Sequence, residues 1–238
     1  MMREQKNYFL VMMGGSGTRF GASVPKQFVE VGGRHVFLYL LDAIESLSVA
    51  DGFVVVSHKD WVDYIKEVTK GKYSKMLAVV EGGDCRSKSV YNGLKELKKY
   101  AKDEDNVLIH DATHPHLDGA KIPELIKQID LYSAATLVSS VYDTCYIKKE
   151  DGLIDHVVDR KTVAVGASPE GFKMGVIYPI YDNASEEELE KMTSAGAIWL
   201  SSGGEMGTVV SELLNLKITY PNDMELYKLL YNNYYDKR

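Results

Sequence analysis

Glycine and basic residues are concentrated in one short segment near the start of this chain, and together they could bind phosphate. The segment Gly14-Gly15-Ser16-Gly17-Thr18-Arg19 and the nearby Lys26 follow an apolar run, residues 8–11, that is typical of a β-strand. Glycines let a backbone bend sharply and approach a ligand closely, and successive N–H groups in such a loop can surround phosphate oxygens. Arg19 and Lys26 add positive charge beside the loop. The pattern therefore predicts a nucleotide-phosphate site directly after a first strand.

This loop differs from the two commonest phosphate-binding motifs. A Walker loop requires Lys and then Ser or Thr after its last glycine, whereas Gly17 is followed by Thr18 and Arg19. A Rossmann loop requires a helix to begin at its third glycine, and Val24-Pro25 interrupts that register. For the loop taken alone, an ordinary glycine-rich connection without a ligand remains the alternative.

Three further segments carry polar side chains at places where a site could form. Residues 81–89 form a second glycine turn that enters a helix, where Ser87 or Ser89 could cap the helix or contact a ligand. Asp111 directly follows an apolar run and could hold Mg²⁺, which takes one or two carboxylates plus substrate phosphates, or could cap the next turn. Lys217 lies in a strand-like run, residues 215–219, where it either faces solvent or binds a second phosphate.

The elements that must position these residues can be predicted from apolar patterns. Strand-like runs cover residues 8–11, 53–56, 77–80, 107–110 and 134–141, and the continuous β-branched run at 53–56 is typical of a parallel strand buried on both faces. Helical periodicity covers residues 36–47, 60–68 (with Asp60 as N-cap), 87–100 and 122–131. The alternation predicts an α/β, Rossmann-like fold: a mostly parallel sheet with right-handed crossovers and helices on both faces. Ligands of such folds bind at the carboxyl ends of the strands.

The pattern changes after Thr144, where short alternating segments flank a turn at residues 148–152. We expect a two-stranded β-arm over residues 145–164. Two strands bury little area by themselves, so the arm should pack on something else, most simply a second subunit. We therefore expect a single domain over residues 1–238, carrying this arm.

Composition and charge exclude several classes of protein. The 238 residues are 45% hydrophobic and 26% charged, which suits a globular protein with a substantial core. The net charge of −6 argues against broad binding to nucleic acid or to an anionic membrane, and no apolar run approaches membrane-spanning length. The polar start of the chain offers no signal-peptide region, and Cys85 and Cys145 match no metal spacing. We expect reduced thiols and a cytoplasmic protein.

Taken together, these segments resemble the family of cytidylyltransferases that make CDP-alditols, which comprises the methylerythritol-phosphate and ribitol-phosphate enzymes. The matching elements span almost the whole chain: Gly14–Arg19, Pro25-Lys26-Gln27-Phe28, Gly82-Gly83-Asp84, Ser89, His110-Asp111-Ala112, Asp143-Thr144, Asp159-Arg160, Pro169 with Phe172, and Asn215-Leu216-Lys217-Ile218-Thr219. The chain resembles the ribitol-phosphate branch more than the other branch. Four segments carry this resemblance: Gly14–Arg19, Lys59-Asp60-Trp61-Val62, a helix at 185–193 and Asn215-Leu216-Lys217.

The resemblance implies an enzyme of the nucleotidyltransferase type that moves CMP from CTP to a small polyol phosphate. D-ribitol 5-phosphate is the first candidate acceptor, and 2-C-methyl-D-erythritol 4-phosphate is the alternative. The catalytic residues implied are Arg19, Lys26 and Lys217, and the metal ligand implied for Mg²⁺ is Asp111. The nucleotide-binding residues implied are Met13, Gly14, Gly15, Ser16, Gly17, Thr18, Gly83, Asp84, Ser89, Asp111 and Ala112. The acceptor-binding residues implied are Thr144, Arg160, Ser168 and Thr193, with Arg160 contributed across a homodimer interface.

Several positions depart from the family pattern, mostly in the part that should bind the acceptor. His114 replaces an arginine, Glu170 replaces a glutamine, and Ser194 replaces an aspartate. Met13 stands where a small residue usually faces the base. Two alternatives therefore stay open: a non-catalytic nucleotide-binding relative, and a nucleotidyltransferase of the same fold that uses another base or a sugar phosphate. The joint presence of Lys26, Asp111 and Lys217 argues against the first.

Overall fold

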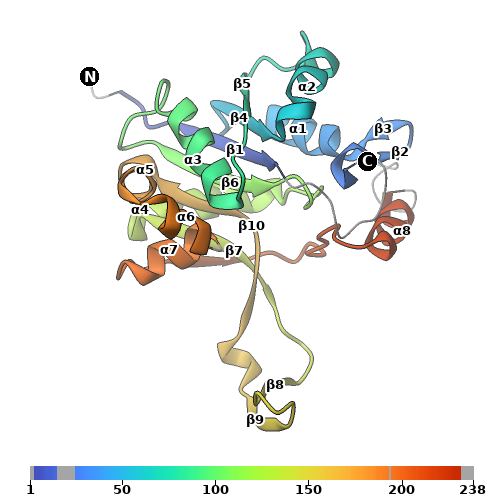
Figure 1. Ribbon diagram of the computed structural model, residues 1–238, viewed down its shortest axis with the longest axis vertical. Coiled ribbons are helices and arrows are strands. Elements are labelled where there is room, and N and C mark those ends of the chain that lie inside the picture. Colours follow the sequence, from blue (N-terminus) through green and yellow to red (C-terminus); the bar gives the residue numbers. More distant parts are fainter. Residues whose placement is uncertain (1–2, 15–24, 193, 232–238) are drawn as a thin grey trace.

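The computed structural model describes residues 3–14, 25–192 and 194–231, and its centre is one seven-stranded sheet (Figure 1). The strand order across the sheet is β11-β7-β10-β6-β1-β4-β5. The strands are β1 (Asn7–Met13), β4 (Gly52–Ser57), β5 (Met76–Glu81), β6 (Asn106–Asp111), β7 (Ala134–Ser140), β10 (Ala164–Lys173) and β11 (Gly207–Val210). All five predicted strands are confirmed, with boundaries that differ by a few residues.

The sheet is parallel except at one strand. β1 pairs with β4 and β6 in parallel register, so that Val11 lies beside both Val55 and His110. β10 runs antiparallel between β7 and β6, with an irregularity between Gly166 and Glu170. The mostly parallel α/β fold is therefore confirmed. Because β1, β4, β5 and β6 point the same way, the loops that follow them meet at one edge of the sheet.

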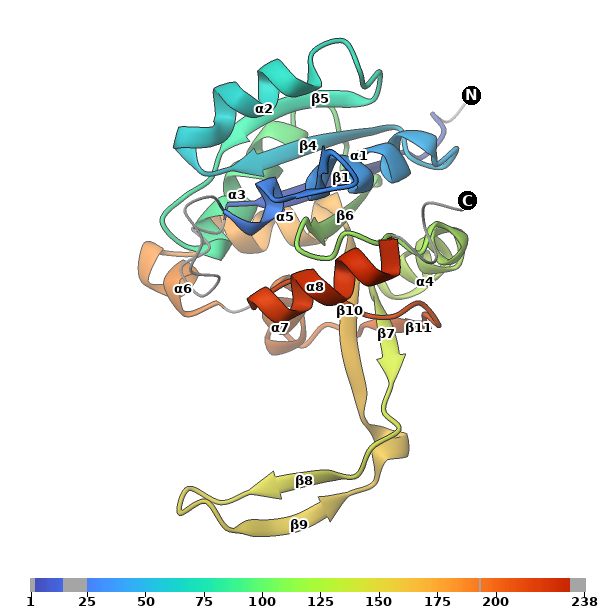
Figure 2. The same cartoon turned by 90° about the vertical axis from the view of Figure 1, so that its right-hand side faces the viewer.

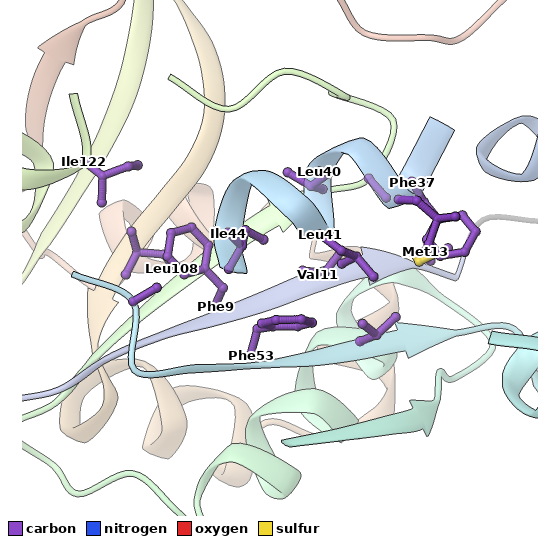
Figure 3. Packing of buried hydrophobic residues seen from close by; sticks show 14 of the residues in the cluster. Phe9, Val11, Met13, Phe37, Leu40, Leu41, Ile44, Phe53, Leu108 and Ile122 are labelled. Carbon is purple, nitrogen blue, oxygen red and sulfur yellow. The ribbon is translucent and has the colours of Figure 1, made fainter. Parts of the chain in front are cut away.

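Helices cover both faces of the sheet, as predicted. They are α1 (Val36–Ser46), α2 (Val62–Thr69), α3 (Arg86–Leu97), α4 (Ile122–Tyr132), α5 (Met174–Asn183), α6 (Glu186–Lys191), α7 (Ala195–Ser201) and α8 (Pro221–Leu230). Side chains of α1, α2 and α4 form one apolar cluster with Phe9, Val11 and Met13 of β1, part of which Figure 3 shows. Side chains of α3, α5, α6 and α7 form a second cluster, on the opposite face of the same strand. Within the described residues, no helix is long and apolar enough to cross a membrane.

Two local predictions are wrong. Asp60 does not cap α2, because it lies inside a 3₁₀ turn (Lys59–Trp61) that precedes the helix, and Trp61 occupies the cap position without a side-chain bond. The run around Lys217 does not pair as a strand. Alternate side chains instead fix this segment. Leu216 and Ile218 are buried in a small apolar cluster with residues of α8, while the Lys217 side chain between them stays half exposed.

The β-arm stands away from the rest of the molecule (Figures 1 and 2). It consists of β8 (Cys145–Lys148) and β9 (Ile154–Val158), which pair only with each other, followed by a 3₁₀ turn at Arg160–Thr162. The large apolar side chains of Tyr146, Ile154 and Val157 are each more than half exposed. The predicted arm is thus present, and it does not fold back on its own sheet.

Candidate active site

A cleft of about 630 Å³ opens at the carboxyl edge of the strands, within the size range of small-molecule sites. Its described lining comes from the loops that follow β1, β4, β5 and β6: Met12, Gly14, Lys26, His58, Lys59, Glu81, Gly82, Gly83, Asp84, Cys85, Arg86, Ser89, Asp111 and Thr113. The structure therefore brings six predicted site residues together: Gly14, Lys26, Gly83, Asp84, Ser89 and Asp111. Gly15, Ser16, Gly17, Thr18 and Arg19 lie outside the described residues.

The wall of the cleft after β5 is shaped by close packing around Ser89. The Ser89 hydroxyl donates to the carbonyl of Cys85 at 2.9 Å and accepts from the N–H of Gly83 at 3.0 Å. A Cβ atom at Gly82 would lie 2.8 Å from Ser89 Oγ, and one at Gly14 would lie 3.3 Å from it, so both positions favour glycine. Ser89 thus packs closely against Gly14 and against the turn at Gly82 and Gly83.

Neither serine of this segment caps α3. Its N-cap is Cys85, whose sulfur accepts weakly from the N–H of Lys88 at 3.4 Å. The Ser87 hydroxyl donates to the carbonyl of Met192 and therefore ties α3 to the segment that contains α6.

Asp111 lies at the end of β6 and forms ion pairs through both of its oxygens. Oδ1 accepts from Arg86 Nη2 at 3.1 Å, and Oδ2 accepts from Lys217 Nζ at 3.1 Å, although Lys217 is 106 residues away in the sequence. Burial would raise the pKa of Asp111, but the charges and hydrogen bonds of Arg86 and Lys217 outweigh burial and lower the pKa to about 2. The carboxylate is therefore ionised at any physiological pH.

Two neutral histidines lie beside this carboxylate. His110 is fully buried in β6, and its Nε2–H donates to the carbonyl of His114 at 2.9 Å, since a carbonyl oxygen can only accept. Burial lowers the pKa of His110 to about 4. Burial, then His110 and Lys217, lower the pKa of His114 to about 4 as well. At neutral pH His114 therefore adds no charge to the site.

Met13 and Ala112 are placed differently from the expectation. The Met13 side chain is buried among core residues, as Figure 3 shows, while its carbonyl accepts from Gln27 Nε2 at 2.8 Å. Met12, one position earlier, lines the cleft instead. The Met13 side chain thus points into the core rather than into the cleft, because successive side chains of a strand point to opposite faces. Ala112 is fully buried, and its N–H donates to the carbonyl of Met12.

The predicted acceptor residues are dispersed within one chain. The Ser168 hydroxyl accepts from the N–H of Asp111 at 3.3 Å, which places it at the edge of the site. Thr144 and Arg160 belong to the arm and its base, where Arg160 donates to the carbonyl of Tyr142, and neither lines the described part of the cleft. Thr193 lies outside the described residues.

Eight of the lining residues were not predicted as site residues from the sequence: Met12, His58, Lys59, Glu81, Gly82, Cys85, Arg86 and Thr113. For Arg86 a signal existed. It is the first residue of α3, where a cation opposes the helix dipole, so a role other than helix formation should have been considered.

The donor set at this edge fits a cation that arrives together with a phosphate ligand. Asp111 is a single carboxylate, and no group of three or more His, Cys, Asp or Glu side chains with metal-binding geometry occurs among the described residues. Mg²⁺ typically takes one or two carboxylates and completes its shell with substrate phosphates and water. Asp111 can therefore contribute to a site for Mg²⁺ bound to a triphosphate, and we assign no further protein ligand.

The sheet, the glycine loops and the charged cleft define an α/β protein of the nucleotidyltransferase type. The solved structure of 4-diphosphocytidyl-2C-methyl-D-erythritol synthase from Anaerococcus prevotii superposes with a TM-score of 0.80 at 25% identity, covering 98% of this chain and 97% of that one. The sequence model of the 2-C-methyl-D-erythritol 4-phosphate cytidylyltransferase (IspD) family matches residues 8–232.

Curated relatives carry two different names. The 2-C-methyl-D-erythritol 4-phosphate cytidylyltransferase of Thermotoga neapolitana is 35% identical over 94% of this chain and 96% of the relative. The ribitol-5-phosphate cytidylyltransferase of Streptococcus agalactiae is 28% identical over 95% of each chain. This chain belongs to the IspD family of cytidylyltransferases, as the resemblance of its motifs predicted.

Proposed function

We propose that this protein transfers CMP from CTP to the phosphate of a five-carbon alditol phosphate, giving a CDP-alditol and pyrophosphate. The observation that carries the proposal is a cleft lined by Lys26 and Asp111, with Lys217 bound to Asp111, in a member of a cytidylyltransferase family. These are the groups that a reaction between two anionic substrates requires.

In the proposed reaction, an oxygen of the acceptor phosphate attacks the α-phosphorus of CTP in line. A new P–O bond forms while the bond to the β-phosphate oxygen breaks, and pyrophosphate leaves with that electron pair. No covalent enzyme intermediate is needed, because positioning and charge stabilisation suffice for phosphoryl-type transfer. We assign Lys26 and Arg19 to the triphosphate and the leaving pyrophosphate, and Lys217 to the α-phosphate.

A divalent cation belongs to this proposal. Enzymes of the family generally depend on one, and Asp111 is the carboxylate that we assign to Mg²⁺ here. When bound, the cation would supply charge neutralisation at the triphosphate. Asp111 itself is ionised, because Arg86 and Lys217 lower its pKa to about 2, so it can serve this role without a change of protonation.

We propose D-ribitol 5-phosphate as the first candidate acceptor. The glycine loop, residues 59–62 and residues 215–217 support it, because their motifs resemble the ribitol-phosphate branch of the family. The second candidate is 2-C-methyl-D-erythritol 4-phosphate, which the name of the family and of the 35% identical relative favours. Both acceptors are five-carbon polyol monophosphates. His114 and Ser194 depart from the family pattern, so these two residues bear on which acceptor is used.

We further propose that the chain is one domain and acts as a homodimer in which the arm delivers Arg160 and Thr144 to the partner's acceptor site. The exposed apolar side chains of Tyr146, Ile154 and Val157 support this assembly, since they require cover. The cytoplasmic location expected from the sequence also remains a proposal, supported by the use of CTP.

The test is a pyrophosphate-release assay with Mg²⁺ and CTP, using D-ribitol 5-phosphate, 2-C-methyl-D-erythritol 4-phosphate and other polyol and sugar phosphates as acceptors. We expect turnover with a five-carbon alditol phosphate, and faster turnover with CTP than with UTP, ATP or GTP. A clear preference for methylerythritol phosphate would contradict D-ribitol 5-phosphate as the acceptor and support the second candidate. No release with any acceptor, despite CTP binding, would favour the non-catalytic alternative.

A further inference from the structure

Arg86 occupies a position that helix formation does not explain. It is the first residue of α3, directly after the glycine turn, and the first turn of this helix contains no acidic residue. The amino end of a helix carries partial positive charge, so a guanidinium there is unfavourable for the helix itself. The contacts that Arg86 makes in the cleft must therefore account for its place.

Arg86 and Lys217 contact different oxygens of the same carboxylate. Arg86 Nη2 donates to Asp111 Oδ1 and Lys217 Nζ donates to Oδ2, both at 3.1 Å. The two cations differ in mobility, because a guanidinium is a rigid planar donor whereas the ammonium of lysine ends a flexible chain. The Lys217 side chain is 50% exposed and that of Arg86 is 35% exposed. Lys217 is thus the partner that can leave, and Arg86 the one that stays.

The inner side of the Arg86 guanidinium is enclosed by protein. Its Nη1 atom is buried and makes no hydrogen bond to the described residues. Burial would lower the pKa of Arg86, but Asp111 and Glu170 raise it above its usual value, so the group stays charged. Glu170 is held in turn, since its Oε2 accepts from the N–H of Gly196 at 3.3 Å.

We propose that Arg86 is a positioning residue that fixes Asp111 through Oδ1, so that the carboxylate keeps its orientation at the cleft when Lys217 moves to the α-phosphate. This inference rests on the proposed function, in which Asp111 holds the divalent cation that accompanies CTP. Without Arg86, the carboxylate would lose the contact that orients it whenever Lys217 is engaged elsewhere. Groups that orient a metal ligand typically change metal affinity or activity 10- to 100-fold when they are removed.

A competing role for Arg86 is direct contact with the triphosphate, because its side chain also lines the cleft. The two roles predict different effects on CTP binding. A positioning residue acts on the part of the affinity that depends on the divalent cation. A phosphate ligand acts on CTP binding whether or not the cation is present.

The experiment is calorimetric titration of CTP without acceptor, in Mg²⁺ and in EDTA, for wild type, Arg86→Ala and Arg86→Lys. We expect Arg86→Ala to reduce the Mg²⁺-dependent gain in affinity about ten-fold or more, and Arg86→Lys to restore part of it. The affinity in EDTA should change by less than about two-fold in both. Arg34→Lys is the matched control, because Arg34 forms a surface ion pair with Asp42 at 2.7 Å outside the cleft lining.

Thermal melts of the same variants check that they fold, and a second measurement isolates the route through Asp111. In an Asp111→Asn background, Arg86→Ala should have no additional effect on CTP binding in Mg²⁺. A further loss in that background, or an equal loss in EDTA and Mg²⁺, would overturn the proposal and make Arg86 a phosphate ligand.

Failure of the proposed function has a different signature. A wild-type protein that gains no CTP affinity from Mg²⁺ would contradict the role of Asp111, and the role of Arg86 with it. A wild-type protein with a normal gain that Arg86→Ala leaves unchanged would contradict the role of Arg86 alone.

Discussion

At the carboxyl edge of the sheet each oxygen of the partly buried Asp111 carboxylate has a cationic partner, whereas in the arm large apolar side chains lie in solvent. Asp111 is contacted by Arg86 and Lys217, both from the same chain. Tyr146, Ile154 and Val157 of the arm have no comparable cover. This difference is the basis of our proposal that one chain provides most of a nucleotide site and that association completes the acceptor side.

The largest loss of activity should come from a change at Asp111, whose two oxygens are paired with Arg86 and Lys217. We expect Asp111→Asn to reduce turnover at least 10²- to 10³-fold, because the neutral amide keeps the shape but loses the charge that anchors the cation and Lys217. The measurement is pyrophosphate release at saturating CTP across a range of Mg²⁺ concentrations. Near-normal turnover at low Mg²⁺ would show that the carboxylate does not hold the metal.

Lys26, which lines the cleft, and Lys217, which pairs with Asp111, provide the next test. Lys26→Ala and Lys217→Ala should each reduce kcat, by about 10²-fold, more than they weaken CTP binding, since both act on charge that increases in the transition state. Steady-state kinetics combined with direct titration of CTP separates the two effects. An increase in KM with unchanged kcat for either variant would instead assign that lysine to ground-state binding.

The arm offers a test in which two inactive proteins complement each other. If Arg160 acts across a dimer, mixing Arg160→Ala with Lys26→Ala and allowing exchange should restore about one quarter of wild-type activity, because half the dimers are mixed and each has one intact site. Mixing Lys26→Ala with Lys217→Ala is the matched control and should restore none, since both lysines belong to the same chain's site. A monomer in sedimentation, or an inactive first mixture after proven exchange, would contradict the arrangement.

The smallest effect concerns stability below neutral pH. The pKa values of His110 and His116 are lowered to about 4 by burial, so below pH 6.5 the unfolded chain binds protons that the folded chain does not. The free energy of unfolding should therefore decrease as pH falls from 7 toward 4, and these two side chains together should lower it by roughly 2–3 kcal/mol at pH 5.5. Asp111 has a pKa of about 2, so its contribution to the stability of the folded chain is lost only in stronger acid.

Urea denaturation at pH 7.0, 6.0 and 5.5 measures how steeply the free energy of unfolding changes with pH, which we call the pH slope. His116→Gln should flatten it, whereas His156→Gln, a change at an exposed arm residue, should leave it as in wild type. A slope that is the same in all three proteins would show that His116 does not contribute.

The sequence predicted the fold well because apolar runs and helical stripes are strong local signals. It did not show that the Met13 side chain points into the core while Met12 lines the cleft, because a strand that is apolar on both faces does not reveal which residues point to which face. β10 was missed because its residues, which include Gly166, Pro169 and Gly171, show no strand alternation. The Arg86–Asp111 pair joins elements that are distant in sequence, and only the folded sheet brings them into contact.

The arm leaves the sheet on β7 and returns on β10, and these strands are direct neighbours that pair at Ser140 and Ala164. The two ends of the arm are therefore one strand spacing apart, about 4.8 Å. A segment with such closely spaced ends can be exchanged between homologous chains as a cassette, with the sheet unchanged. Variation in the acceptor could in this way evolve in the arm while the nucleotide chemistry of the cleft is inherited intact.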